Sequence, residues 1–160
     1  MTDPSHRKGL RPRSSYKHFS AITTRWMDND AYGHINNVVY YSFFDTVVNR
    51  YLIEGGFLDI GGGEVIGLVV ETACRYTQPI AFPEAVTAGL LVAHIGNSSV
   101  RYEVGLFRGD EEGAAAEGHF VHVYVDRESR RPAPLPEALR RLLQSLLADG
   151  QPGAASRYSS

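Results

Sequence analysis

The sequence WMDNDAYGHINNVVY, residues 26–40, decides how this chain folds. It joins a polar loop to the start of a long apolar segment, residues 37–53. The loop holds two carboxylates, Asp28 and Asp30, together with a Gly-His step and two side-chain amides. Few structural loops need this mixture, whereas a catalytic carboxylate held near the N-terminus of a helix needs most of it.

Residues 37–53 predict a long helix with apolar side chains on nearly every side. The segment contains no Gly or Pro and is too long for most strands, and Gly55-Gly56 then provide a stop. A helix with this pattern is usually enclosed by protein. We therefore expect the other elements of the chain to wrap around it.

The rest of the chain favours one antiparallel sheet. The expected strands are residues 17–26, 65–76, 85–95, 99–108 and 114–126, and a short final helix is expected at 136–147. Turn residues at 96–97 and 109–113 separate the later strands by hairpin-length links. We therefore expect the last four strands to form a meander, in an α+β domain with five antiparallel strands and a long central helix.

Composition sets the class of protein. The chain has 160 residues, which suits one domain, and its 16 basic and 18 acidic residues leave a net charge of −2. Non-specific electrostatic binding to nucleic acid needs an excess of basic side chains, so we expect no nucleic-acid partner. The single cysteine, Cys74, excludes an internal disulfide and is interpreted as a small buried hydrophobe in a reducing compartment.

The composition of both ends of the chain indicates that they lie outside the folded domain. Residues 1–15 are polar and basic, and residues 149–160 are small and polar, so we expect a disordered N-terminal extension, a domain at 16–148 and a flexible C-terminal tail. The N-terminus lacks the apolar core of a signal peptide, and no apolar run reaches the length of a membrane span. We therefore expect a cytoplasmic protein without a membrane partner.

The histidines do not predict a metal site. Of the six, His119 and His122 are three positions apart in an expected strand, so their side chains should face opposite sides of the sheet. No group of ligands has metal-site spacing. We expect neither a metal nor another cofactor.

Residues 28–40 resemble the signature of hotdog-fold acyl-CoA thioesterases of the 4-hydroxybenzoyl-CoA thioesterase-like group, D-x-D-x-x-G-H-x-N-N-x-x-Y. Weaker similarities follow at residues 73–76, 96–100 and 130–132, and the resemblance covers roughly residues 17–147. It implies a hotdog fold, in which a five-stranded antiparallel sheet wraps around a long helix. It also implies a homo-oligomer, a dimer or a homotetramer, with active sites at the dimer interface.

The resemblance implies an enzyme that hydrolyses an acyl-CoA substrate to the carboxylic acid and free CoA. Asp30 matches the catalytic aspartate, either as nucleophile or as general base, and the backbone N–H of Asn37 matches the oxyanion donor. The residue types agree, because the chain has no Gly-x-Ser-x-Gly element and its one cysteine lies in an expected strand. Substrate-binding roles are implied for Gly33, His34, Asn36, Tyr40, Ser98 and Ser99.

Simpler roles stand beside each of these. An Asp before a helix is often a cap, which is our interpretation of Asp28, and Asn36 and Asn37 are common helix starters. His34 is equally suited to a structural hydrogen bond, Tyr40 to the core, and the two serines to a hairpin turn. Two other functions stay open: a hotdog-fold hydratase or dehydratase acting on acyl thioesters, and a non-catalytic acyl-CoA-binding protein. The acyl group, and the choice between CoA and acyl-carrier-protein thioesters, are also open.

Overall fold

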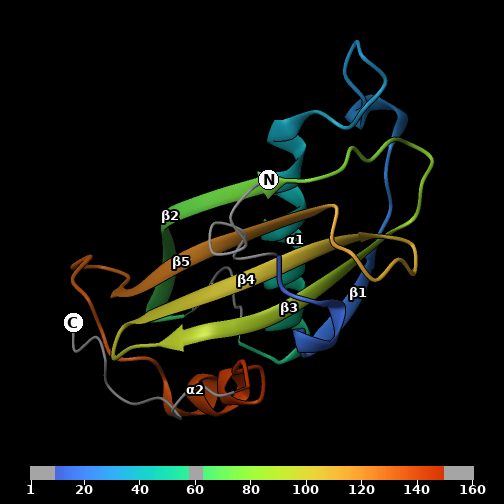
Figure 1. Ribbon diagram of the computed structural model, residues 1–160. Helices are drawn as coiled ribbons and strands as arrows, with labels where there is room; N and C mark the ends of the chain where they lie inside the picture. The colour runs from blue at the N-terminus through green and yellow to red at the C-terminus, as the bar shows by residue number, and fades with distance from the viewer. Residues whose placement is uncertain (1–9, 58–62, 150–160) are drawn as a thin grey trace, which may run out of the picture.

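The computed structural model describes residues 10–57 and 63–149 (Figure 1). Its elements in chain order are η1 Arg13–Ser15, β1 His18–Ile22, η2 Trp26–Asp28, α1 Asn37–Glu54, β2 Val65–Tyr76, β3 Val86–Ile95, β4 Ser99–Arg108, β5 Ala116–Asp126 and α2 Glu137–Gln144. Most of the expected N-terminal extension and C-terminal tail lies outside the described residues. Residues 10–15, which we assigned to the extension, include the 3₁₀ turn η1 and contact the sheet.

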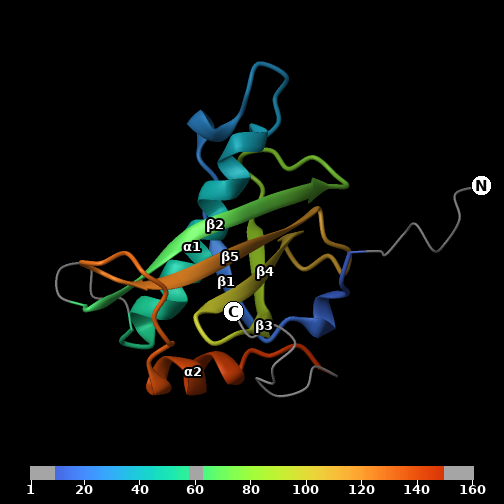
Figure 2. The ribbon, with the colours of Figure 1, turned by 90° about the vertical axis from the view of Figure 1, so that its left-hand side faces the viewer.

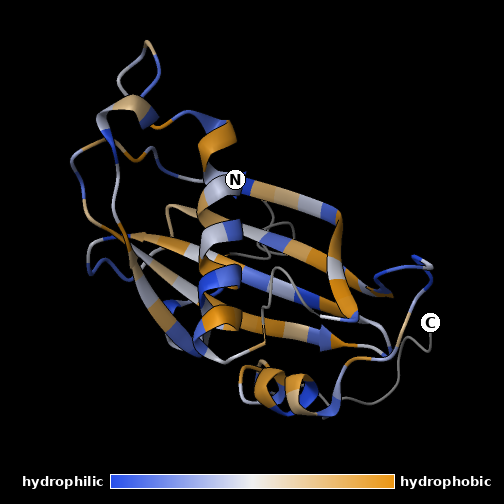
Figure 3. Cartoon of the chain, turned by 180° about the vertical axis from the view of Figure 1, so that it is seen from behind, coloured by the Kyte–Doolittle hydropathy of each residue, from blue (hydrophilic) through white to orange (hydrophobic). Residues whose placement is uncertain are grey.

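The sheet has five antiparallel strands in the order β1-β3-β4-β5-β2, and α1 lies across one of its faces (Figures 1 and 3). We call this covered face the inner face. This arrangement confirms the α+β hotdog prediction. None of the described helices is long and apolar enough to cross a membrane.

The expected four-stranded meander is wrong at its first link. β2 pairs with β5 rather than with β3, so residues 77–85 cross from one side of the sheet to the other instead of closing a hairpin. This link packs against the polar loop before α1. The Ile35 N–H donates to the Ile80 carbonyl at 2.7 Å, and the Phe82 N–H donates to Asn29 Oδ1 at 3.0 Å. The loop and the crossover therefore support each other.

α1 begins at Asn37 after the N-cap Asn36, and it ends at Glu54 with Gly55 as the C-cap. Its buried side chains are Tyr40, Phe43, Phe44, Val47, Val48 and Leu52, and they pack on the inner face of the sheet. The expectation that the whole helix is enclosed is wrong for a single chain. Its other side carries exposed residues, among them Asp45, Arg50 and Val38, which is 63% exposed. The sheet covers only one side of the helix because it curves around it without closing.

Close packing between α1 and β5 depends on Gly118. A Cβ at this position would lie 2.2 Å from the Phe44 ring and 2.7 Å from the Ala73 carbonyl oxygen. Gly118 therefore faces the helix, and so do the residues at even positions along β5, while Glu117 and His119 face the outer side. This confirms that His119 and His122 point to opposite faces of the sheet.

β2 is an edge strand with little cover. All twelve of its residues are half-buried or exposed, and they include Leu68, Val69 and Val70, with Val70 59% exposed. β2 pairs with β5 along one side only, so its other side offers backbone groups that are unpaired within the described residues. The other edge strand is β1, and α2 packs under its neighbour β3 through Leu139 and Leu143 (Figure 2).

Candidate active site

The polar loop before α1 is closed by its own backbone. The Asp30 N–H donates to the His34 carbonyl at 2.7 Å, and the Gly33 N–H donates to the Asp30 carbonyl at 3.1 Å. Gly33 has a φ of 81°, a left-handed conformation that favours glycine at this turn. The Gly-His step of the motif therefore shapes the loop, and it turns the chain back toward the start of α1.

The Asp30 carboxylate is half-buried and only partly engaged. Its Oδ1 accepts from the Tyr32 N–H at 2.8 Å and from the His34 N–H at 3.4 Å. Its Oδ2 has no hydrogen-bond partner within residues 10–57 and 63–149. One oxygen thus fixes the carboxylate in the loop, and the other is left for chemistry.

Asp28 caps the short 3₁₀ turn η2 and not α1, whose N-cap is Asn36. It is 1% exposed, and its Oδ2 accepts from the Arg25 backbone N–H at 2.8 Å at the start of η2. Its Oδ1 accepts from the Arg25 guanidinium at 2.8 and 3.1 Å. These bonds from Arg25 occupy both carboxylate oxygens, so Asp28 holds the entry to the loop and is not turned toward a substrate.

The first turn of α1 offers a hydrogen-bond donor. Asn36 is the N-cap, and its Oδ1 accepts from the Val38 N–H at 3.2 Å. The Asn37 N–H has no acceptor in the described part of the chain, and Asn37 is exposed. Unpaired N–H groups and the helix dipole make this terminus partly positive. An oxyanion placed here would be stabilised.

An open cleft of about 300 Å³ lies beside this helix start. It is lined by His34, Ile35, Asn37, Tyr40, Tyr76, Thr77, Gln78 and Pro79. The structure thus brings His34, Asn37 and Tyr40 to one cleft. Asp30 does not line the cleft, but it lies on the loop that contributes His34 and Ile35 to the wall. Gly33 and Asn36 shape this wall without lining the cleft.

Two tyrosines form the inner side of the cleft. Tyr40 is 3% exposed, and its ring meets the Tyr76 ring edge-on at 4.8 Å. The Tyr76 hydroxyl donates to the Asn37 carbonyl at 3.0 Å, which ties the end of β2 to the start of α1. The pKa of both hydroxyls is raised, mainly by burial, so both stay neutral. We did not single out Tyr76 from the sequence, where its only signal was an aromatic residue just before a Pro-containing bend.

Ser98 and Ser99 are not near this cleft in a single chain. They lie at the turn between β3 and β4, where the buried Ser98 accepts from the Tyr124 N–H through its carbonyl at 2.7 Å. Ser99 is at the start of β4, and the cleft lies near the opposite end of this strand. The strand is about 30 Å long. Any contact between these serines and a substrate in the cleft would have to involve a second copy of the chain.

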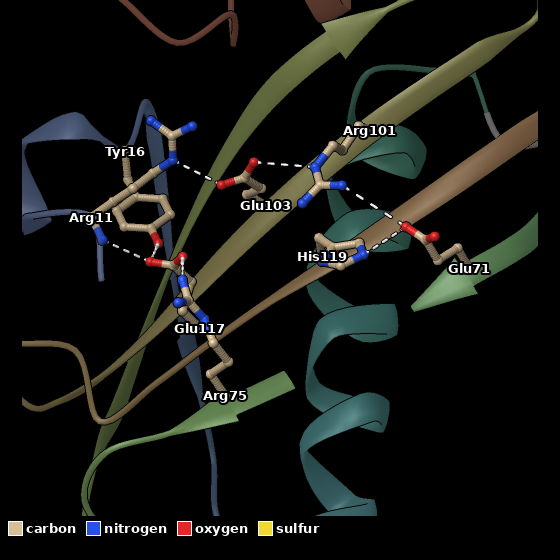
Figure 4. Close-up of polar contacts among 8 residues, drawn as sticks. All are labelled: Arg11, Tyr16, Glu71, Arg75, Arg101, Glu103, Glu117 and His119. Carbon is tan, nitrogen blue, oxygen red and sulfur yellow. Dashed lines mark hydrogen bonds and ion pairs between the residues drawn. The ribbon is translucent and has the colours of Figure 1, made fainter. Parts of the chain in front are cut away.

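A second polar cluster occupies the outer face of the sheet (Figure 4). Glu103 accepts from Arg11 Nε at 2.8 Å and from Arg101 Nε at 3.3 Å. Glu71 accepts from His119 Nε2 at 2.8 Å, and Arg101 Nη1 lies 3.9 Å from the same carboxylate.

Glu117, in the same cluster, accepts from the Arg75 side chain at 3.1 Å and from the Arg11 backbone N–H at 2.7 Å. Burial raises the pKa of Glu103, but the hydrogen bonds and charges of Arg11 and Arg101 outweigh this, and its net pKa lies below the ordinary value. Each carboxylate has a cationic partner, so the cluster fastens the N-terminal segment to the sheet. Within the described ranges, no three His, Cys, Asp or Glu side chains are placed to share a metal ion.

Comparison with known proteins agrees with this geometry. A family model described as the thioesterase-like superfamily matches residues 24–143. The crystal structure of the PA5185 protein from Pseudomonas aeruginosa strain PAO1 is similar at 56% identity over 88% of this chain and 98% of that chain, with a TM-score of 0.84. A thioesterase from Thermus thermophilus, complexed with coenzyme A and Zn, is 30% identical over 86% of this chain and 98% of its own, with a TM-score of 0.69.

A more distant protein shares the fold alone. Slr0204, a 1,4-dihydroxy-2-naphthoyl-CoA thioesterase from Synechocystis, is 13% identical over 78% of this chain and 93% of its own, with a TM-score of 0.73. No curated protein sequence matches the chain. The family match extends from the segment before the polar loop into α2, and so includes both the loop and the cleft. The chain therefore belongs to the thioesterase-like superfamily, and the prediction of a hotdog-fold thioester hydrolase is confirmed.

Proposed function

We propose that this enzyme hydrolyses acyl-CoA thioesters to the carboxylic acid and free CoA, with Asp30 as nucleophile or general base and the Asn37 backbone N–H as oxyanion donor. One observation carries this assignment. The unengaged Oδ2 of Asp30 lies on a loop that folds back onto a helix start whose first N–H has no acceptor among the described residues. The similar Thermus thermophilus thioesterase, which was solved with coenzyme A, supports CoA as the carrier.

The chemistry follows from these two groups. In the nucleophilic route, Asp30 attacks the thioester carbon, the CoA thiolate leaves, and water then hydrolyses the resulting anhydride. In the general-base route, Asp30 removes a proton from water as the water oxygen attacks, and that proton passes on to the thiolate. Both routes place negative charge on the former carbonyl oxygen, where one preorganised N–H stabilises the transition state by about 3 kcal/mol.

The other predicted residues receive supporting roles in this proposal. His34 contacts the thioester region from the cleft wall, and Tyr40 covers the acyl group from the side of α1. Gly33 and Asn36 keep the loop and the helix start in position. Ser98 and Ser99 contact the CoA moiety bound to a second copy of the chain.

We further propose that two copies pair through their β2 edges. The edge is long and apolar, and one side of it is unpaired in the described structure, which is the usual template for strand addition. Two-fold symmetric pairing runs the two strands antiparallel. The Val65 end of one copy then lies beside the Tyr76 end of the other, so each cleft is completed by its partner. A dimer is the smallest assembly that achieves this, and a tetramer is a pair of such dimers.

The test is the Asp30→Asn variant, assayed for release of free thiol from a panel of acyl-CoAs. The amide keeps the oxygen that accepts from Tyr32 and His34, so the loop should stay folded. It lacks the nucleophilic and basic oxygen, so kcat should fall by roughly 10²- to 10⁴-fold. Asp110→Asn is the matched control, because Asp110 lies exposed in the turn between β4 and β5 and should change nothing.

Near-normal turnover by Asp30→Asn would refute the assignment. Water addition to an enoyl-CoA without thiol release would instead identify a hydratase. Tight acyl-CoA binding by the wild type with no thiol release over hours would identify a binding protein. Circular dichroism of each variant checks that it has folded.

A further inference from the structure

Tyr76 reaches the start of α1 from a distant part of the chain. It is the last residue of β2 and pairs with the buried Ala116 of β5. Its ring is 43% exposed and meets the Tyr40 ring edge-on at 4.8 Å. Its hydroxyl donates to the Asn37 carbonyl at 3.0 Å, across 39 positions of the chain. Tyr76 thus bonds the residue whose backbone N–H is the proposed oxyanion donor.

The peptide unit between Asn37 and Val38 is held at both ends by side chains. Its carbonyl accepts from the Tyr76 hydroxyl, and its N–H donates to Asn36 Oδ1 at 3.2 Å. A peptide unit is planar, so two hydrogen bonds at opposite ends fix its orientation. The backbone that follows the Asn37 Cα atom is therefore fixed by two side chains from different segments.

The peptide unit before the Asn37 Cα atom carries the donor itself. The N–H of Asn36 is anchored, because it donates to the Asp28 carbonyl at 2.9 Å, whereas the N–H of Asn37 has no acceptor among the described residues. The direction of the Asn37 N–H therefore depends on the backbone on either side of it. Loss of the Tyr76 hydrogen bond would leave the following peptide unit with a single side-chain partner.

The direction of this N–H affects the rate of the proposed reaction. An oxyanion donor lowers the barrier when it already points to the place where negative charge develops. Helix ends open more easily than helix centres, and a displacement of about 1 Å can reduce a rate by roughly 10²-fold. A hydrogen bond from the sheet to the first residue of α1 opposes such opening. The Tyr76 hydroxyl stays a donor, because burial raises its pKa.

We infer that Tyr76 is a positioning residue, whose hydroxyl bonds the Asn37 carbonyl and thereby holds the Asn37 N–H in the direction that the oxyanion needs. This inference rests on the proposed function. In this role the hydroxyl acts through the backbone of Asn37 and touches no reacting atom. It should therefore affect kcat much more than KM.

The test is Tyr76→Phe, which removes the hydroxyl and keeps the ring that contacts Tyr40. Thiol release from a panel of acyl-CoAs should show a kcat about 10-fold lower and a KM within about twofold of the wild-type value, because the donor is present but less well directed. Amide hydrogen exchange of residues 38–41, followed by NMR without substrate, should be faster than in the wild type. Tyr51→Phe is the matched control, since it removes a hydroxyl that lies 3.5 Å from Ser145 Oγ, away from the cleft. It should change neither measurement.

An unchanged kcat in Tyr76→Phe would overturn the inference. A higher KM at unchanged kcat would also overturn it and would assign the hydroxyl to substrate binding. A lower kcat without faster exchange at residues 38–41 would overturn it as well, because the hydroxyl would then act on the reacting group directly. An active Asp30→Asn variant would remove the proposed function, whereas the exchange measurement needs no substrate and tests the Tyr76 hydrogen bond separately.

Discussion

At the scale of single residues, two aspartates in one motif have different surroundings. Asp28 is buried and bound by Arg25, whereas Asp30 is half-buried and has one oxygen without a partner among the described residues. Sequence reasoning expected a capping role for Asp28, and the structure places that cap at η2 rather than at α1. It could not show how Arg25 binds Asp28, because this depends on the backbone turn at η2.

Replacing Asp28 with Ala should reduce stability and have little direct effect on the chemistry. The variant loses a cap and the charge-assisted hydrogen bonds from Arg25, and we expect the free energy of unfolding to fall by about 1–3 kcal/mol. Urea denaturation of Asp28→Ala and Asp30→Asn, each compared with the wild type, checks this. Asp30→Asn should stay within about 0.5 kcal/mol. An equal loss in both variants would contradict the division of roles.

His122 should make the protein sensitive to acid. Its pKa is about 4 in the folded protein and near 6.5 when exposed, so between these values the unfolded chain binds a proton that the folded chain does not. The contribution of His122 to the free energy of unfolding is therefore constant above about pH 7. As the pH falls from 6.5 toward 4, the free energy of unfolding decreases by about 3 kcal/mol in all. Urea denaturation at pH 7.5 and pH 4.5 should show a smaller loss for His122→Leu than for the wild type, and equal losses would contradict the shift.

At the scale of elements, the sequence predicted the bounds of helices and strands more reliably than it predicted which strands pair with each other. The ranges 65–76 and 99–108 agree with β2 and β4, because apolar runs and flanking turn residues mark their ends. β1 is shorter than expected, since the chain turns into η2 after Thr24. The place of β2 beside β5 could not be predicted, because nothing in residues 77–85 specifies which edge the crossover reaches.

Gly118 tests the packing between α1 and β5. In Gly118→Ala the added methyl would overlap the Phe44 ring and approach the Ala73 carbonyl, so we expect a loss of about 1–3 kcal/mol in stability. Gly113→Ala is the control, because a Cβ there meets nothing within 4 Å. Thermal unfolding of the two variants should differ clearly. A Gly118→Ala protein as stable as Gly113→Ala would show that the helix can move away from the sheet at little cost.

At the scale of the whole molecule, contacts between distant segments decide what the chain can do. The outer cluster joins Arg11 to β2, β4 and β5, and the cleft joins the loop, α1 and the crossover. The motif predicted a site at Asp30 and the helix start, which are neighbours in sequence. Tyr76, His122 and the outer cluster were not assigned functions from the sequence, because each depends on the packing of segments far apart in the chain.

The proposed pairing through β2 predicts the effect of a charge on that edge. In Val70→Lys two like charges would come close to the two-fold axis, so we expect dissociation into monomers and loss of thioesterase activity together. Phe19→Lys is the matched control, since Phe19 is 42% exposed on β1 at the other edge of the sheet. Sedimentation velocity and thiol release measure the two effects. A fully active monomer would exclude a shared active site.

Cys74 has a practical consequence for the enzymology proposed above. It is the only thiol in the chain, and burial raises its pKa to about 11. At an assay pH of roughly 8, only about one in a thousand of these thiols is ionised, and the thiolate is the form that reacts with chromogenic disulfide reagents. The protein should therefore add almost no background when such a dye counts released CoA. The rate at which the same sulfur is alkylated should measure how well the β2 edge is shielded from solvent.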